Sequence, residues 1–320
     1  MDIIALDGYT LNPGDNPWDE VEKLGNLLVY DRTDTHQILE RASGADIIIT
    51  NKAPLFAETL EQLPRLGFIS ITATGYNIVD IIAARKRGIP VSNVPEYGTD
   101  SVAQFTFALL LELCHHVGIH NDTVKAGEWS QSKDWCFWKT PQLLLTGKKM
   151  GLIGFGRIGR RVGELAHAFG MEVLAYDPQQ NDVPAYKQFH WKSQEDLFEE
   201  ADVISLHCAQ TDDNVGFVNH DLLNLMKKDA LFINAARGGL VNEGDLVRAL
   251  NDGRIAGAAL DVASIEPIRK DNPLLTAHNC LITPHIAWAA VAARRKLMTL
   301  TAKNIKAFMA GTPINVVNGL

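Results

Sequence analysis

The chain of 320 residues has little of what marks secreted, metal-binding or nucleic-acid-binding proteins. Its four cysteines are scattered without metal-site spacing, which is typical of reduced thiols in a cytosol and predicts no metal site. A net charge of −8 argues against a nucleic-acid or anionic-membrane partner. No apolar run reaches the roughly 18 residues of a membrane span. Acidic Asp2 stands where a secretion signal needs basic residues. We expect a cytoplasmic protein without membrane or nucleic-acid partners.

Glycine is not scarce, and three glycines have a distinctive spacing. Gly154, Gly156 and Gly159 form a G-x-G-x-x-G pattern between a short apolar run and a helical stretch over 157–169. In such a turn the first glycine permits the sharp bend, the second lets a pyrophosphate approach the backbone, and the third lets the helix pack close to the sheet. The helix then directs its unpaired N–H groups at the phosphates. The pattern predicts a dinucleotide site.

An acidic residue supports this prediction and indicates which dinucleotide binds. A second strand is expected over 171–176, and Asp177 follows it, 18 residues after Gly159. The expected distance for an acid that hydrogen-bonds a ribose 2′-hydroxyl is about 20 residues. Because a carboxylate would repel a 2′-phosphate, we predict NAD rather than NADP. The alternative is an ordinary strand–helix turn in which Asp177 only begins a turn with Pro178.

Strand and helix patterns alternate through both halves, which predicts an α/β fold with two parallel sheets covered on both faces. Helix breakers over 94–98 indicate a boundary, and the last helical stretch, 289–309, is expected to return to the first domain. We therefore predict one domain from 1–98 and 289–320, and a second from 99–288. The expected strands are 2–6, 27–30, 45–50, 68–74 and 89–92 in the first domain, and six in the second, beginning near 150, 171, 201, 230, 257 and 280.

Three predicted strand ends of the second domain carry ionisable residues, and ligands of parallel sheets gather at such ends. Arg237 precedes two glycines, and its guanidinium would suit a carboxylate clamp. His285 is a candidate for acid–base work near neutral pH. Glu266 beside it would favour the imidazolium form. Taken singly, each residue has a plainer interpretation: a surface arginine, a structural histidine and a solvated glutamate.

Two other regions suggest a ligand or a partner. The loop with Gly75 follows a predicted strand and could offer backbone N–H groups to a small carboxylate, although Gly75 could equally only make a turn. The irregular region 117–145 carries exposed-type aromatics. The aromatic residues are Trp129, Trp135, Phe137 and Trp138. They could cover a local core, but we favour the interpretation that this region is an arm that contacts a second copy in a dimer.

Taken together, these motifs resemble the D-2-hydroxyacid dehydrogenase family. The resemblance rests on 73–80, the glycine turn, 236–241, 257–267 and 283–285. Within the family, 51–52, 129–138 and 284–289 are most similar to glycerate dehydrogenases, also called hydroxypyruvate reductases. The resemblance implies a discontinuous flavodoxin-like substrate domain, an NAD-binding Rossmann domain, a homodimer, and an active site in the cleft between the domains.

The resemblance also implies roles for individual residues. Arg237 would bind the substrate carboxylate and carbonyl oxygen, His285 would donate the proton in reduction and accept it in oxidation, and Glu266 would pair with His285. Further expected substrate contacts are Lys52, Gly75, Tyr76 and Trp288. Besides the three glycines, the expected NAD contacts are Thr74, Arg157, Ile158, Asp177, Cys208, Ala235, Ala236 and Asp261.

The predicted function is reversible hydride transfer between NADH and a small 2-oxo acid, converting hydroxypyruvate or glyoxylate to D-glycerate or glycolate. One alternative keeps the chemistry and changes the acid to phosphoglycerate-type or apolar substrates, a choice that Lys52 and the tryptophans would shape. Another is a non-catalytic, NAD-sensing scaffold similar to the family's corepressors. Intact Arg237, Glu266 and His285 do not exclude the scaffold, but the absence of long disordered tails disfavours it.

Overall fold

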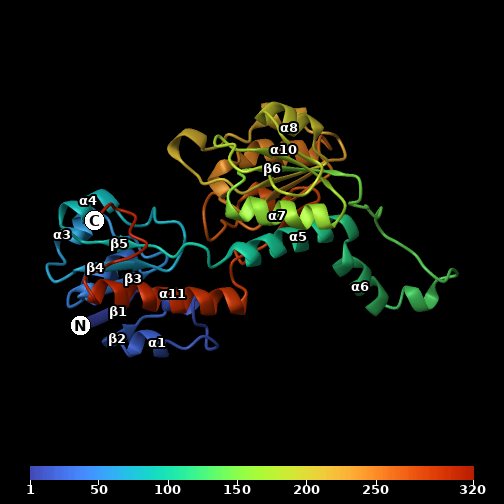
Figure 1. Ribbon diagram of the computed structural model, residues 1–320. Helices are drawn as coiled ribbons and strands as arrows, with labels where there is room; N and C mark the ends of the chain where they lie inside the picture. The colour runs from blue at the N-terminus through green and yellow to red at the C-terminus, as the bar shows by residue number, and fades with distance from the viewer. The chain divides into compact units, whose positions relative to one another are not determined.

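The computed structural model describes residues 1–320, and the chain divides into two compact units (Figure 1). Unit 1 comprises Met1–Gly98 and Ala289–Leu320, and unit 2 comprises Thr99–Trp288. Each unit is an α/β structure built on one parallel sheet. The predicted fold class, two α/β domains with parallel sheets, is therefore confirmed.

Unit 1 contains a five-stranded parallel sheet in the order β2-β1-β3-β4-β5, which is the flavodoxin-like order. Every residue of β3 and β4 is buried, because helices cover both faces of the sheet. The strands are β1 Asp2–Ala5, β2 Asn26–Val29, β3 Ile47–Thr50, β4 Phe68–Ile71 and β5 Val91–Ser92. The helices are α1 Asp19–Glu22, α2 Ile38–Ala42, α3 Ala57–Glu61, α4 Ile81–Lys86 and α11 Val291–Met309, with short 3-10 helices η1 Gly8–Thr10 and η2 Thr35–Gln37.

The last helix, α11, completes the core of unit 1 although it is distant in sequence. Its Phe308 stacks on Phe68 of β4 with ring centroids 4.5 Å apart. Near its start, buried Arg294 forms an ion pair with Asp15 at 2.5 Å. The amide of Asn16 donates to the carbonyl of Arg294 at 3.1 Å. These contacts explain why the C-terminal segment belongs to the same unit as the N-terminal strands.

Unit 2 contains a seven-stranded parallel sheet in the order β12-β11-β10-β9-β6-β7-β8. The predicted number of six was wrong by one strand, the edge strand β8, which has only three residues and no fully buried side chain. From β8 to β11 the order is the 3-2-1-4-5-6 of dinucleotide-binding sheets, and β12 extends it. The strands are β6 Lys149–Ile153, β7 Glu172–Tyr176, β8 Phe189–Trp191, β9 Val203–Leu206, β10 Leu231–Asn234, β11 Gly257–Leu260 and β12 Cys280–Ile282.

Helices cover both faces of this sheet with separate apolar cores. One core includes Phe107 of α5 and Val162 of α7, and the other includes Phe198 of α8, Leu222 of α9 and Leu246 of α10. The helices are α5 Thr99–His115, α6 Val117–Lys125, α7 Arg157–Ala168, α8 Gln194–Glu200, α9 His220–Leu225 and α10 Glu243–Asn251. Short 3-10 helices are η3 Trp129–Gln131, η4 Asp212–Asn214, η5 Gly238–Leu240 and η6 Pro273–Thr276.

The aromatic region after α5 does not form a local core. Figure 1 shows α6 and the chain after it running away from the sheet of unit 2. Trp135 is 86% exposed and Trp138 is 68% exposed. The indole of Trp129 donates to the carbonyl of Trp135 at 3.0 Å, so the turn is held by its own contacts. Side chains this exposed do not cover a core, which removes that interpretation of the region.

No single helix is long and apolar enough to cross a membrane. Helices α5 and α6, which are bent by 56° to each other, together have the length and apolar composition of a membrane span.

An ion-pair network at the end of α8 predicts a pH-dependent contribution to stability. Glu200 accepts from Lys192 at 2.6 Å and from Lys149 of β6 at 2.9 Å, and these bonds lower its pKa from 4.5 to about 2. Because the folded pKa lies below the unfolded value, the contribution is complete above pH 4.5 and is lost as the pH falls toward 2. Glu200→Gln should therefore lower the melting temperature at neutral pH, and the difference from the wild type should shrink in acid. Exposed Glu195→Gln on the same helix is the control, and a difference that stays constant with pH would contradict the prediction.

Candidate active site

The glycine turn after β6 uses its three glycines for different reasons. Gly154 has φ +91°, and a Cβ there would lie 2.5 Å from the backbone nitrogen of Cys208. A Cβ on Gly159 would lie 2.1 Å from the carbonyl oxygen of Gly154. The fold itself therefore requires glycine at both positions. At Gly156 a Cβ would meet nothing within 4 Å, and φ is an unstrained −73°. The fold itself therefore does not require glycine at 156, which agrees with the expectation that a ligand approaches the backbone there.

Asp177 follows β7 and holds the same turn. One carboxylate oxygen accepts from the backbone N–H of Phe155 at 2.8 Å, and the other accepts from Gln179 at 2.9 Å. The residue thus begins its own turn, as the plainer interpretation supposed, and also fixes the glycine turn. Each carboxylate oxygen can accept a second hydrogen bond, so the same group can still receive a ribose hydroxyl.

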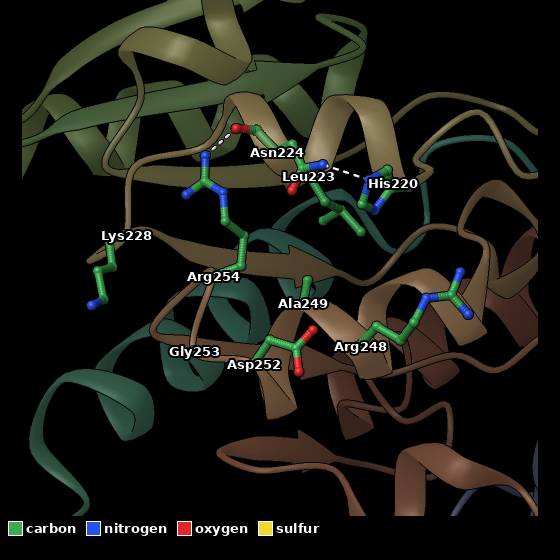
Figure 2. Close-up of a pocket in the computed structure, with 9 residues that line it drawn as sticks. All are labelled: His220, Leu223, Asn224, Lys228, Arg248, Ala249, Asp252, Gly253 and Arg254. Carbon is green, nitrogen blue, oxygen red and sulfur yellow. Dashed lines mark hydrogen bonds between the residues drawn. The ribbon is translucent and has the colours of Figure 1, made fainter.

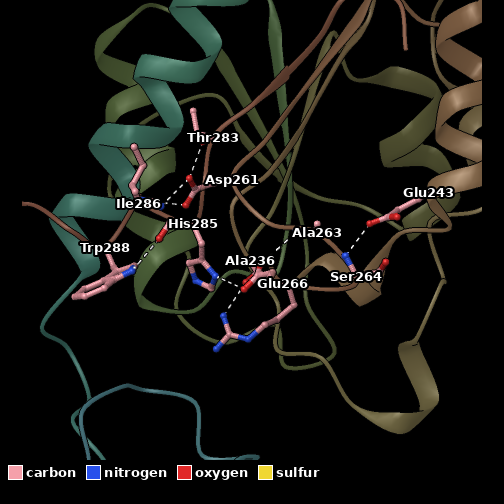
Figure 3. Close-up of polar contacts among 12 residues, drawn as sticks. Ala236, Glu243, Asp261, Ala263, Ser264, Glu266, Thr283, His285, Ile286 and Trp288 are labelled. Atoms are coloured by element: carbon pink, nitrogen blue, oxygen red, sulfur yellow. Dashed lines mark hydrogen bonds and ion pairs between the residues drawn. The ribbon is translucent and has the colours of Figure 1, made fainter. Parts of the chain in front are cut away.

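Arg237, Glu266 and His285 follow three neighbouring strands, β10, β11 and β12. Because these strands are parallel, their carboxyl ends meet at one edge of the sheet. The Nδ1 atom of His285 and a carboxylate oxygen of Glu266 are 2.7 Å apart, and Figure 3 shows the two side chains facing each other. This hydrogen bond leaves Nε2 as the ring nitrogen directed at other groups. The predicted pairing of Glu266 with His285 is therefore present.

The loop that carries His285 has a strained backbone held by a buried acid. His285 has φ +56°, which is uncommon for a residue with a side chain. Asp261, which is 1% exposed, accepts from the Thr283 hydroxyl at 2.6 Å and from the N–H groups of Ile286 and Ala287 at 2.9 and 2.8 Å (Figure 3). Asp261 was expected to contact a cofactor. The structure shows a different role, which the sequence analysis missed: Asp261 holds the His285 loop in place.

Arg237 is positioned by its neighbours on the chain. Its backbone is extended, and η5 begins directly after it. Buried Asn234 braces the turn, accepting from the N–H of Ala236 at 3.0 Å and donating to the carbonyl of Arg237 at 2.9 Å. One guanidinium nitrogen donates to the carbonyl of Ala236 at 2.7 Å. A guanidinium has five N–H groups, so most of its donors remain for an anionic ligand.

Burial changes the ionisation of two consecutive residues whose backbone lies next to Gly154. Burial raises the pKa of the Cys208 thiol to about 11 and lowers the pKa of His207 to about 3. The imidazole Nε2 of His207 lies 2.9 Å from the hydroxyl of buried Ser205. At neutral pH both residues are therefore uncharged, and Cys208 is a thiol rather than a nucleophilic thiolate. The structure therefore gives no support for covalent catalysis by Cys208.

In unit 1, one carboxylate organises the loop that contains Lys52. Asp7, at the end of β1, accepts from the backbone N–H groups of Asn51, Lys52 and Ala53 at 2.8, 2.5 and 2.9 Å. The amide of Asn51 donates to the carbonyl of Thr72 at 2.9 Å. Nothing in the sequence pattern singled out Asp7, because an acid after a strand gives no sign of which N–H groups it will meet.

The second predicted loop of unit 1 is fastened at its first residue. The Thr74 hydroxyl donates to the carbonyl of Val94 at 3.1 Å, and the amide of Asn93 donates to the carbonyl of Thr74 at 2.7 Å. Tyr76 is 41% exposed. The loop follows β4, which neighbours β3 in the parallel sheet, so the Lys52 and Tyr76 loops lie at the same sheet edge.

A cavity of about 410 Å³ between α9 and α10 contains none of these residues. Its cations do not converge, since Figure 2 shows Lys228 and Arg248 on opposite sides. Arg248 pairs with Asp245 outside the cavity lining, and Arg254 donates to the carbonyl of Asn224. Cations used in this way do not form an anion site, and we assign the cavity no ligand.

The sheet order and the glycine turn define a dinucleotide-binding protein, and comparison with known proteins specifies its family. Residues 107–287 match the D-isomer specific 2-hydroxyacid dehydrogenase, NAD binding domain, and the chain belongs to this family. It is 49% identical to a hydroxypyruvate reductase of Blautia hydrogenotrophica over 99% of this chain and 100% of the relative. It is 39% identical to a glycerate dehydrogenase of Methylorubrum extorquens over 90% of each chain.

Solved structures agree with this assignment. The D-lactate dehydrogenase of Aquifex aeolicus, complexed with NAD and lactic acid, has a TM-score of 0.84 at 30% identity and covers 97% of this chain and 96% of its own. D-2-hydroxyisocaproate dehydrogenase has a TM-score of 0.85 at 26% identity with full coverage of both chains. The protein is therefore an NAD-dependent oxidoreductase of the 2-hydroxyacid dehydrogenase type.

Because the fold requires glycine at 159 but not at 156, alanine at these two positions should affect different properties, stability and NADH binding respectively. Gly156→Ala should fold like the wild type, since its Cβ meets no atom, but should weaken NADH binding about tenfold or more by blocking the ligand's approach. Gly159→Ala should instead lower the free energy of unfolding by about 1–3 kcal/mol through overpacking. Thermal unfolding and NADH fluorescence titration measure the two effects. Unchanged NADH affinity in Gly156→Ala would refute the assigned role of that glycine.

Proposed function

We propose that this enzyme reduces hydroxypyruvate or glyoxylate with NADH and, in reverse, oxidises D-glycerate or glycolate. The hydrogen bond of 2.7 Å between His285 and Glu266, at the sheet edge where Arg237 also emerges, carries the proposal. Relatives named hydroxypyruvate reductase, glycerate dehydrogenase and, in Aeropyrum pernix, glyoxylate reductase at 35% identity support the substrate class.

His285 moves the proton. Its Nδ1 atom is engaged by Glu266, so Nε2 donates to the substrate's carbonyl oxygen in reduction and takes the proton back from the hydroxyl in oxidation. The carboxylate of Glu266 orients the ring and stabilises positive charge on it while the proton is held. Bound NADH supplies the hydride.

Arg237 holds and polarises the 2-oxo acid. Its guanidinium can take the carboxylate and the carbonyl oxygen through two N–H groups, which also stabilises negative charge that develops on that oxygen. We further propose that Lys52, the backbone of Gly75 and Tyr76, and Trp288 contact the substrate. The anchored backbone of the Lys52 loop supports this, because a fixed loop presents its side chain in one place.

For the cofactor we propose contacts at the glycine turn and at the neighbouring strand ends. Gly156 and the start of α7 would receive the pyrophosphate, and Asp177 would accept from the ribose 2′-hydroxyl. The full proposed set is Thr74, Gly154, Gly156, Arg157, Ile158, Gly159, Asp177, Cys208, Ala235, Ala236 and Asp261. Comparing NADH with NADPH in the assay below, for the wild type and for Asp177→Ala, tests this role, because loss of the carboxylate should relax the preference for NADH.

A substrate screen tests the proposed function. The purified protein with NADH should turn over hydroxypyruvate or glyoxylate with a higher kcat/KM than pyruvate, bulkier apolar 2-oxo acids or phosphorylated acids. A preference for one of the latter would replace the substrate assignment, and no NADH oxidation with any acid would favour a non-catalytic scaffold. His285→Gln should lower kcat by about 10²–10⁴-fold with little change in NADH affinity. Unchanged turnover in this variant would remove His285 from its role.

We also propose that the protein is a cytoplasmic homodimer in which the region around Trp135 reaches a second copy. The exposed apolar side chains of this region support an interface, since large exposed aromatics in one segment are typical of binding surfaces. The four unpaired cysteines are compatible with a reducing compartment.

Light scattering tests the dimer. The wild type should have the mass of two chains, and replacing both Trp135 and Trp138 by serine should shift it toward one chain, because their apolar area is lost from the interface. The control is Ile82→Ser, a similarly exposed apolar position (66%) on α4 of unit 1, which should leave the mass unchanged. A single-chain mass for the wild type would refute the proposal.

A further inference from the structure

Glu243, the first residue of α10, directs its side chain away from its own helix. One carboxylate oxygen accepts from the backbone N–H of Ser264 at 2.7 Å, a bond visible in Figure 3, and the other accepts from the amide of Asn272 at 2.9 Å. The helix N-terminus does not need this carboxylate as a cap, because Asn242 already accepts from the N–H of Asp245 at 3.1 Å. The contacts of Glu243 instead join α10 to the segment between β11 and β12.

That segment carries Glu266. The N–H of Ala263 donates to one oxygen of Glu266 at 3.3 Å, while the other oxygen bonds His285 at 2.7 Å. A continuous path therefore runs from Glu243 through the backbone of Ser264 to Glu266 and then to the imidazole. A displacement of the segment at Ser264 would move Glu266 relative to the ring that it orients.

The same segment lies directly on the turn that carries Arg237. A Cβ added to Gly238 would lie 1.9 Å from the carbonyl carbon of Ala263 and 2.4 Å from the nitrogen of Ser264. Glu243 stands at the other end of this short turn, five residues after Gly238. Two points of attachment, the close backbone contact at Gly238 and the carboxylate of Glu243, thus join this segment to the stretch of chain that directly follows Arg237.

We propose that Glu243 is a positioning residue. It fixes the position of the segment that carries Glu266 relative to the turn that carries Arg237. It touches neither substrate nor cofactor in this scheme and acts through the main chain of Ser264. The inference rests on the proposed roles of Arg237, Glu266 and His285.

A carboxylate is the group that this position requires. Its two partners, the N–H of Ser264 and the amide of Asn272, are both donors, and a carboxylate accepts from both. Glutamine has the same length but offers one acceptor and one NH₂ group, so one donor would face another donor. The Glu243→Gln variant therefore breaks one attachment while keeping the size of the side chain.

The test combines this variant with a compensating exchange. In Glu243→Gln kcat for 2-oxo acid reduction should fall about 10- to 100-fold, the scale expected for a small misplacement of catalytic groups, with NADH affinity unchanged. Adding Asn272→Asp restores an acceptor for the glutamine NH₂, while the second oxygen of the introduced carboxylate can keep the bond that Asn272 receives from the N–H of Leu274. The double variant should recover kcat. Glu195→Gln, in the first turn of α8, controls for loss of a helix-start charge and should have no effect.

A measurement independent of turnover separates this inference from the proposed function. NMR of histidine-labelled protein, with His285 assigned by His285→Gln, should show that Glu243→Gln moves the titration midpoint of His285 alone and that the double variant moves it back. A folded Glu243→Gln protein with unchanged kcat and unchanged His285 titration overturns the inference, as does a folded double variant that recovers neither. If the wild type reduces no 2-oxo acid, the proposed function fails, and the His285 titration still decides whether Glu243 sets its surroundings.

Discussion

The parallel direction of the strands is the constraint on which the active site depends. In a parallel sheet all carboxyl ends lie at one edge, so residues that follow different strands become neighbours even when the sequence separates them widely. Arg237, Glu266 and His285 follow the adjacent strands β10, β11 and β12, and the glycine turn follows β6 of the same sheet. One sheet thus brings a candidate acid–base pair, an arginine proposed to bind the substrate carboxylate, and a dinucleotide turn to a single edge.

Acidic side chains that follow strands in both sheets hold the neighbouring loops in place by accepting hydrogen bonds from them. Asp177 receives two backbone N–H groups, Asp261 receives two and a hydroxyl, and Asp7 receives three. Backbone N–H groups in loops are not paired with a neighbouring strand as they are in a sheet. A buried N–H group without an acceptor lowers the free energy of unfolding. A carboxylate with several acceptor positions satisfies the whole loop at once. This explains how irregular segments, including the unusual backbone of His285, are held in one conformation.

Much of this architecture could be predicted from the sequence. Apolar runs and turn residues located most of the strands, and the glycine spacing located the dinucleotide turn, because these are local signals. The edge strand β8 was missed because three residues without a buried face give no periodic pattern. The clamps by Asp261, Asp7 and Glu243 were missed for a different reason. Each depends on which backbone N–H groups the fold brings near a carboxylate, and no spacing in the sequence records that.

The anchor at Asp7 has an implication for how such an enzyme changes its preference among acids. All three donors that it collects belong to the main chain of 51–53, so this anchor does not use the side chain of Lys52. Lys52 can be exchanged for a shorter, neutral or apolar residue while the peptide path remains. If Lys52 contacts the substrate as proposed, this contact can change in evolution while Asp7 keeps the backbone of the loop in place.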